Sequence, residues 1–191
     1  RYLLSKNATD RDISIVEGVM GYYDGMGLTS TRASAYEVAG VTESPVVLVV
    51  GAKGASLSVL ATIHGFLTFC PRPRIQGVIL NRISPMAYAA LSKEIEARFG
   101  IRCFGYLPQM ADCALESRHL GLVTAAEVEN LREKLQALAQ QAEKTVDLDG
   151  LLHLADLAEP VRCEPVVLPK REPVSIAVAR DKAFCFYYED S

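Results

Sequence analysis

The chain has 191 residues, half of them hydrophobic, and a formal net charge of −3. This length allows one domain with a substantial core, or one domain and part of another, and the small charge excludes the basic surface that a nucleic-acid-binding protein needs. No apolar run approaches the ~20 residues of a membrane-spanning helix, and no signal peptide is visible at the start. The five cysteines form no Cys-x-x-Cys pair, which favours free thiols in a reducing cytoplasm over disulfides or a zinc site.

The first part of the chain predicts a strand followed by a glycine-rich loop. Residues 1–11 are polar and look like the end of a preceding segment, and residues 12–16 form a β-branched, apolar run that predicts a buried strand. Glu17 and Asp24 then lie in a loop with glycines at positions 18, 21 and 25. A carboxylate fixed at a strand end, with glycines that let a ligand approach, is a common way to build a site. The alternative is a surface loop with incidental acids.

The middle of the chain alternates between helical and strand patterns. Ser30 and Thr31 predict the cap of a helix that ends near Ala39, with Gly40 as its stop. Further elements are predicted, in chain order, at 45–50 (strand), 56–69 (helix), 75–80 (strand), 85–99 (helix), 102–106 (strand), 124–144 (helix) and 147–157 (helix). The alternation predicts an α/β fold with a mostly parallel sheet and helices on both faces.

Sites in such sheets lie at the carboxyl ends of the strands. This rule predicts one edge that gathers Glu17, the turn 51–54, Asn81 with Arg82, and Leu107 with Pro108. Residues 160–173 contain four prolines and predict a linker. Residues 174–179 predict a new strand, after which the chain ends.

Several motifs together resemble the cobyrinate a,c-diamide synthase family. In chain order they are Glu17-Gly-Val-Met-Gly-Tyr-Tyr-Asp-Gly25, Ala52-Lys-Gly54, Gly77-Val-Ile-Leu-Asn-Arg82, Gly105-Tyr-Leu-Pro108, Arg118-His-Leu-Gly-Leu122 and the stretch from Ile176 to Tyr188. They cover nearly the whole chain, and the first and last are specific to this amidotransferase group. Cobyric acid synthase and dethiobiotin synthetase look like more distant relatives.

The resemblance implies a two-domain enzyme. A P-loop-type domain, similar to dethiobiotin synthetase, binds ATP and Mg²⁺, and a glutamine amidotransferase domain supplies ammonia. The reaction would amidate the a and c acetate groups of a corrinoid, through acyl phosphates, in cobalamin biosynthesis. On this basis residues 1–159 are a partial ATP-binding domain, 160–173 a linker and 174–191 the first strand and loop of the glutaminase domain.

Two parts of the family pattern are absent, which limits what this chain could do alone. No Gly-x-x-x-x-Gly-Lys-[Ser/Thr] phosphate loop occurs in the sequence, and the glutaminase half is represented only by its opening, so we expect a fragment that does not turn over. Cys185 lies far upstream of where the family's nucleophile would be and is expected to be structural. Gly51 stands where the family often has an acidic residue before Ala-Lys, which weakens any role for Lys53.

The family implies specific roles for individual residues, each with a simpler alternative. Glu17 resembles the Mg²⁺-associated acid, since Mg²⁺ takes one or two carboxylates together with phosphate oxygens and water, and Asp24 resembles an acid at the phosphoryl-transfer centre. Asn81 resembles an asparagine that reads the adenine edge, or is a turn residue. The remaining candidates are Leu107 and Pro108 for the base pocket, and Tyr23, Ser30 and Thr31 for substrate binding. Ser30 and Thr31 could bind an anionic group at a helix start, and they could equally well be plain helix caps.

Three questions stay open at the level of the sequence. The same chemistry could act on hydrogenobyrinate or on nickel-bound sirohydrochlorin, and the fold could also serve a non-catalytic nucleotide-binding or interaction module. A homodimer is implied only by the resemblance to dethiobiotin synthetase. Arg118 and His119 lie in a family motif, and no step of the reaction is assigned to either.

Overall fold

The computed structural model describes residues 1–114, 128, 130–161, 163–164, 166–167, 172–181, 184–185 and 187–188. The chain divides into two units, one of residues 17–159 and one of residues 1–16 with 160–191. Each unit is described by itself.

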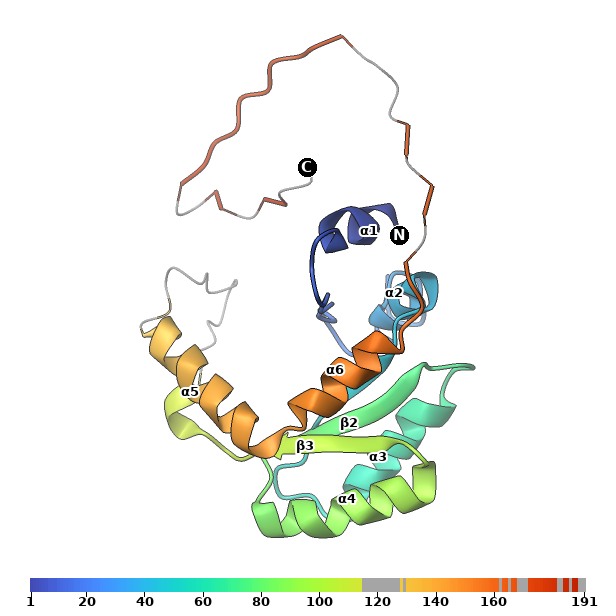
Figure 1. The fold of residues 1–191 in the computed structure, drawn as a ribbon, viewed down its shortest axis with the longest axis vertical. Helices are drawn as coiled ribbons and strands as arrows, with labels where there is room; N and C mark the ends of the chain where they lie inside the picture. Colours follow the sequence, from blue (N-terminus) through green and yellow to red (C-terminus); the bar gives the residue numbers. More distant parts are fainter. Residues whose placement is uncertain are drawn as a thin grey trace. The chain divides into compact units, whose positions relative to one another are not determined.

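The larger unit is built on a three-stranded parallel sheet in the order β1 (Val46–Gly51), β2 (Ile75–Asn81), β3 (Arg102–Leu107). The helices α3 (Ser58–Thr68) and α4 (Pro85–Phe99) connect these strands and pack against each other on one side of the sheet, and α6 (Leu148–Asp156) lies on the other (Figure 1). The predicted α/β class, the parallel sheet and the helices on both faces are therefore confirmed.

The core lies between the sheet and the helices α3 and α4. Ile63, Val78, Leu80 and Ile95 are fully buried there. Burial of an aliphatic side chain of this size contributes about 1.5–3 kcal/mol. The apolar run of β2 thus has most of the covered environment that such runs favour, whereas β1 is less covered, since Val49 is 64% exposed.

The helix α4 begins and ends where the sequence predicts. The Ser84 hydroxyl accepts a hydrogen bond from the Ala87 amide at 3.3 Å, and Pro85 occupies the first turn. Gly100 closes the helix with a left-handed φ of 66°, a conformation that glycine adopts without steric cost.

The helix predicted at 31–39 is displaced towards the carboxyl terminus, to α2 (Ala35–Thr42). Ser34, not Ser30 or Thr31, is its cap: the Ser34 hydroxyl accepts from the Glu37 amide at 3.2 Å, and the Glu37 carboxylate accepts from the Ala33 amide. This reciprocal pair satisfies two amides that a helix start leaves unpaired. Gly40 stays helical, and the helix ends one turn later at Glu43.

The beginning of the predicted helix 124–144 lies outside the described residues, as do Arg118 and His119. Its described part is α5 (Leu131–Thr145), which leads through Val146 into α6. A short 3₁₀ helix, η1 (Ala111–Cys113), follows β3.

The smaller unit corrects two sequence predictions. Its described residues hold one helix, α1 (Tyr2–Ala8), which the sequence did not predict, and neither 12–16 nor 174–179 is a strand. Ile15 and Val16 are 87% and 55% exposed. A β-branched run becomes a strand only when a neighbouring strand accepts its backbone hydrogen bonds, and the described part of the chain supplies no such neighbour to either run.

Candidate functional site

The carboxyl edge of the sheet brings three of the predicted site positions together. Gly51, Asn81 and Leu107 are partners in register across the three strands. Two backbone hydrogen bonds continue the ladder past the strands, from the Ala52 amide to the Asn81 carbonyl at 2.8 Å and from the Ile83 amide to the Leu107 carbonyl at 3.2 Å. Because the strands are parallel and in register, their ends form a single shelf at this edge.

The side chains on this shelf are half-buried. Asn81, Leu107 and Pro108 are each intermediate in exposure. No hydrogen bond joins the Asn81 side-chain amide to another described residue, and the amide is not a buried unpaired group. An amide offers both a donor and an acceptor, so Asn81 retains the chemistry needed to read the edge of a base, with two apolar side chains beside it.

Arg82 is a site residue whose conformation the sequence did not reveal. Its φ is +61°, a left-handed value that costs a non-glycine residue about 1 kcal/mol. A β-carbon at Gly51 would lie 3.2 Å from one of the Arg82 guanidinium nitrogens. The glycine that departs from the family pattern therefore leaves room for an arginine side chain, which adds a cation to the carboxyl edge.

The glycines of the glycine-rich loop are required by close contacts with neighbouring atoms, not by unusual φ angles. A β-carbon at Gly21 would overlap the Asp24 carboxylate, one at Gly25 would overlap the Ser30 and Arg32 carbonyls, and one at Gly18 would lie 3.1 Å from the Ala35 β-carbon. None of these glycines has a positive φ. The loop is thus folded tightly on itself and on the segment before α2.

The two predicted acids, Glu17 and Asp24, are both exposed. Asp24 closes a tight turn, because its amide donates to the Gly21 carbonyl at 2.9 Å. Glu17 does not follow a strand, so the strand-end rule that grouped it with Asn81 does not apply. Among the described residues, no group of three or more His, Cys, Asp or Glu side chains could hold a metal ion.

Two tyrosines of this loop and one of α2 contact the segment that runs from the last turns of α3 to the start of β2. The hydroxyl of Tyr22 donates to the Pro73 carbonyl at 2.5 Å, that of Tyr23 to the Phe66 carbonyl at 2.5 Å, and that of Tyr36 to the Pro71 carbonyl at 2.9 Å. The pKa of Tyr22 is raised to about 12, mainly by burial and then by the neighbouring tyrosines and Cys70. The pKa of Tyr23 is also raised to about 12, again mainly by burial. Sequence reasoning singled out Tyr23 but missed Tyr22 and Tyr36, since the segment that accepts their hydrogen bonds is distant in sequence.

These tyrosines and the carboxyl-edge residues lie at opposite ends of β2. Pro73 precedes the first residue of the strand, and Asn81 is its last. The six steps from Ile75 to Asn81 span about 20 Å at roughly 3.3 Å per residue. The structure therefore brings Asn81, Leu107 and Pro108 together and anchors Tyr23 elsewhere. Ser30 and Thr31 form local hydrogen bonds before α2. The Ser30 hydroxyl accepts from the Arg32 amide at 3.1 Å, and the Thr31 carbonyl accepts from the Ser34 amide at 3.1 Å.

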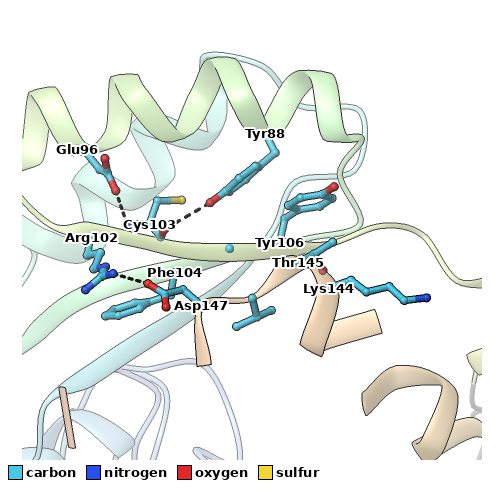
Figure 2. A pocket seen from close by; sticks show the side chains of 11 residues that line it. Tyr88, Glu96, Arg102, Cys103, Phe104, Tyr106, Lys144, Thr145 and Asp147 are labelled. Carbon is cyan, nitrogen blue, oxygen red and sulfur yellow. Dashed lines mark hydrogen bonds and ion pairs between the residues drawn. The ribbon is translucent and has the colours of Figure 1, made fainter. Parts of the chain in front are cut away.

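An open depression of about 510 Å³ lies along the outer edge of β3, between α4 and the junction of α5 and α6 (Figure 2). Tyr88 and Glu96 of α4 reach the backbone of Cys103, the former donating to its carbonyl at 3.4 Å and the latter accepting from its amide at 3.0 Å. On the other side, Asp147 forms an ion pair with Arg102, and its amide donates to the Phe104 carbonyl at 2.7 Å (Figure 2).

These contacts close the edge of β3 to further pairing. Burial raises the pKa of the Cys103 thiol to about 11 and that of Tyr88 to about 12. Neither group is therefore ionised near neutral pH. The polar groups of the depression mostly satisfy one another, so we read it as a structural edge cover rather than as a reaction centre.

The open parallel sheet places the chain among the α/β proteins, a class whose ligand sites generally lie at the carboxyl edge of the sheet. Cobyrinate a,c-diamide synthases match it over nearly its whole length. The protein from Caldanaerobacter subterraneus subsp. tengcongensis is 43% identical over 192 residues, covering 99% of this chain and 42% of that protein. The protein from Streptococcus sanguinis is 40% identical over 183 residues, with coverage of 95% and 40%, and that from Gloeobacter violaceus is 42% identical over 182 residues, with coverage of 93% and 40%.

Over nearly its whole length the chain is similar to one part of cobyrinate a,c-diamide synthases. It spans about two fifths of the length of the curated relatives it matches. No family model matches the chain, and no solved structure matches it either. Among the helices that the structure describes, none combines the length and the apolar character required to cross a membrane.

Proposed function

We propose that this chain is part of an ATP- and Mg²⁺-dependent ligase that amidates the a and c acetate carboxylates of cobyrinate with glutamine-derived ammonia. The observation that carries the proposal is the 36–43% identity to cobyrinate a,c-diamide synthases over nearly the whole chain. The pathway would be cobalamin biosynthesis, in the cytoplasm. The ammonia would come from a glutaminase domain, to which residues 174–191 would belong, and a homodimer is part of the same expectation.

The carboxyl edge is proposed to hold the nucleotide. Asn81 would hydrogen-bond the adenine edge through its amide, and Leu107 with Pro108 would contact the faces of the base. This assignment is supported by their register, by their half-buried state and by the unused amide of Asn81. Arg82, beside Gly51, adds a positive charge suited to nucleotide phosphates.

The glycine-rich loop is proposed to carry the acids. Glu17 would ligate Mg²⁺, for which an exposed carboxylate is a suitable hard oxygen donor. When bound, Mg²⁺ would neutralise charge on the phosphates. Asp24 would act at the reacting centre, and Tyr23, Ser30 and Thr31 are the candidates near the substrate.

The reaction has two balanced steps. An acetate oxygen of the corrinoid attacks the γ-phosphorus of ATP, the bond to the bridging oxygen breaks and ADP leaves, which yields an acyl phosphate. Ammonia then attacks the acyl carbon, phosphate leaves with the bonding electron pair, and the nitrogen loses a proton to give the amide. Asp24, as a fixed carboxylate, is suited to orient ammonia and accept that proton.

The test uses the full-length natural protein that contains this chain. ATP hydrolysis and amide formation are measured with Mg²⁺ and ammonia, with and without cobyrinate, for the wild type, Glu17→Gln and the control Asp149→Asn, an exposed acid of α6. We expect hydrolysis stimulated by cobyrinate, a diamide product, a loss of at least tenfold in Glu17→Gln and little change in the control.

Two other outcomes would replace the proposal. Stimulation only by hydrogenobyrinate or by nickel-bound sirohydrochlorin would keep the chemistry and change the substrate. A folded protein that binds ATP and hydrolyses it with none of these macrocycles would be a non-catalytic nucleotide-binding module.

A further inference from the structure

Three tyrosine hydroxyls from two separate segments all bond to carbonyls of one short segment. The hydroxyls of Tyr22, Tyr23 and Tyr36, here called the tyrosine clamp, donate to the carbonyls of Pro73, Phe66 and Pro71, respectively. This accepting segment runs from the last turns of α3 to the start of β2. The clamp therefore ties the glycine-rich loop and α2 to a rigid connection of the sheet.

Aromatic contacts hold Tyr23 at the centre of the clamp. Its ring stacks on Phe66 with centroids 5.8 Å apart and an interplanar angle of 15°, and it lies 5.2 Å from Phe69, 4.8 Å from Tyr22 and 5.2 Å from Tyr36. Such ring pairs stabilise the packing beyond the apolar area that they bury. These ring contacts and the hydroxyl bond to the Phe66 carbonyl together hold the Tyr23 side chain in place.

Asp24 follows Tyr23 directly, and its backbone is fixed on both sides. On one side its amide donates to the Gly21 carbonyl, and on the other the Met26 amide donates to the Arg32 carbonyl at 2.7 Å. Its carboxylate nevertheless remains exposed and lies against Gly21. A held backbone with a free carboxylate is the arrangement that a reacting acid requires.

We propose that Tyr23 is a positioning residue for Asp24: its hydroxyl bond to the Phe66 carbonyl and its ring contacts fix the turn from which the carboxylate projects. The proposal rests on the role of Asp24 in the proposed function. It gives Tyr23 a role through its neighbour rather than through the substrate, because its hydroxyl already has a protein acceptor and its ring is enclosed.

A double-mutant cycle in the full-length natural protein tests this coupling. The variants are Tyr23→Phe, which keeps the ring and removes the donor, Asp24→Asn, and both together. The matched control is Tyr88→Phe, which removes a hydroxyl-to-carbonyl bond on α4, far from Asp24 in sequence. Tyr36→Phe, at the more exposed Pro71 bond, is a milder clamp variant.

For Tyr23→Phe we expect kcat for cobyrinate amidation with ammonia to fall on the order of tenfold, with the KM values for ATP and cobyrinate unchanged. In the Asp24→Asn background Tyr23→Phe should have no further effect, because both changes remove the same contribution. If the losses in kcat of the two single variants multiply in the double variant, the positioning role is overturned. A raised KM for cobyrinate in Tyr23→Phe at unchanged kcat would also overturn it and would indicate instead that Tyr23 contacts the substrate.

Hydrogen exchange of peptides that cover residues 17–36 gives a readout independent of the reaction. Loss of one hydrogen bond should accelerate exchange in this region roughly fivefold in Tyr23→Phe, less in Tyr36→Phe and not at all in Tyr88→Phe. Unchanged exchange in Tyr23→Phe would overturn the clamp itself. A wild type that lacks amidation but shows the expected exchange pattern would refute the proposed function and the role at Asp24 while leaving the clamp in place.

Discussion

The α-carbon of Gly105 lies against the backbone carbonyl of Thr145, so closely that a β-carbon at position 105 would overlap that oxygen. Gly105 also has a φ of +133° and forms an isolated antiparallel bridge with Val146. The last described helices, α5 and α6, are thus joined to the sheet at a position where only glycine fits.

We predict that Gly105→Ala lowers the free energy of unfolding by about 3 kcal/mol or more, since it combines an overlap with backbone atoms and a φ that side chains rarely adopt. Urea denaturation measures the change. The control is Gly40→Ala in α2, where a β-carbon meets nothing within 4 Å and where we expect a gain of about 0.5–1 kcal/mol. Equal stabilities of the two variants would mean that the junction does not pack on β3 in this way.

Asp147 has two separable roles, and the prediction distinguishes them. Its carboxylate accepts from the Gly150 amide at 2.9 Å at the start of α6 and pairs with Arg102. The ion pair is exposed, with 51% and 39% of the two side chains accessible, so it contributes at most about 1 kcal/mol. Asp147→Asn, which keeps a capping oxygen, should cost less than about 1 kcal/mol.

Asp147→Ala removes the cap as well and should cost about 1–2 kcal/mol in chemical denaturation. The order of the two variants is the decisive observation. If Asp147→Asn were as damaging as Asp147→Ala, the ion pair and not the cap would dominate this junction.

The sequence predicted the order of the strands and helices in the larger unit because those elements have local signals. The apolar runs of β1 and β2 and the Ser84, Pro85 and Gly100 boundaries of α4 can be read directly from neighbouring residues. The register that aligns Asn81 with Leu107 follows from the parallel arrangement. The carboxyl edge was therefore predictable once the strands were recognised.

The features that the sequence did not reveal depend on contacts between distant residues. The strand expected at 12–16 had the right composition, but composition does not supply a pairing partner. The start of α2 was misplaced because Ser30, Thr31 and Ser34 are all good caps, and Glu37 selects Ser34. The tyrosine clamp and the left-handed φ of Arg82 likewise arise from tertiary packing that no local pattern records.

The raised tyrosine pKa values predict how stability depends on pH. Tyr22, Tyr23 and Tyr88 have pKa values of about 12, chiefly because burial disfavours the phenolate. In the unfolded chain they would ionise near 10. Because the folded pKa lies above the unfolded one, their contribution to stability is complete below about pH 10 and is lost as the pH rises towards 12.

Absorbance at 295 nm checks this directly. We expect some of the eight tyrosines to titrate near pH 10 and a further group only near pH 12, accompanied by a falling urea midpoint from pH 10 upward. In Tyr88→Phe the amplitude of the late group should shrink. A single transition near pH 10, with the protein still folded, would contradict the burial of these hydroxyls.

The side-chain amide of Asn81 is the part of the carboxyl edge whose proposed role can be tested by binding alone. Adenine offers a donor and an acceptor to an amide, and guanine offers a different pattern. We predict that Asn81→Asp, which removes the donor at nearly constant volume, weakens ATP binding in the full-length natural protein by about five- to a hundredfold and reduces its preference over GTP. Isothermal titration measures both affinities.

The control for Asn81 lies on the same strand. Gln76 is an exposed amide five positions earlier on β2, so Gln76→Glu makes the same chemical change, and adds the same charge, near the opposite end. Its ATP affinity should remain within about twofold of the wild type, because a charge about 16 Å away along the strand is largely screened at physiological ionic strength. An equal loss of ATP affinity in both variants would indicate a general charge effect. Unchanged ATP affinity in Asn81→Asp would mean that Asn81 is not part of the base pocket and is a turn residue at the end of β2.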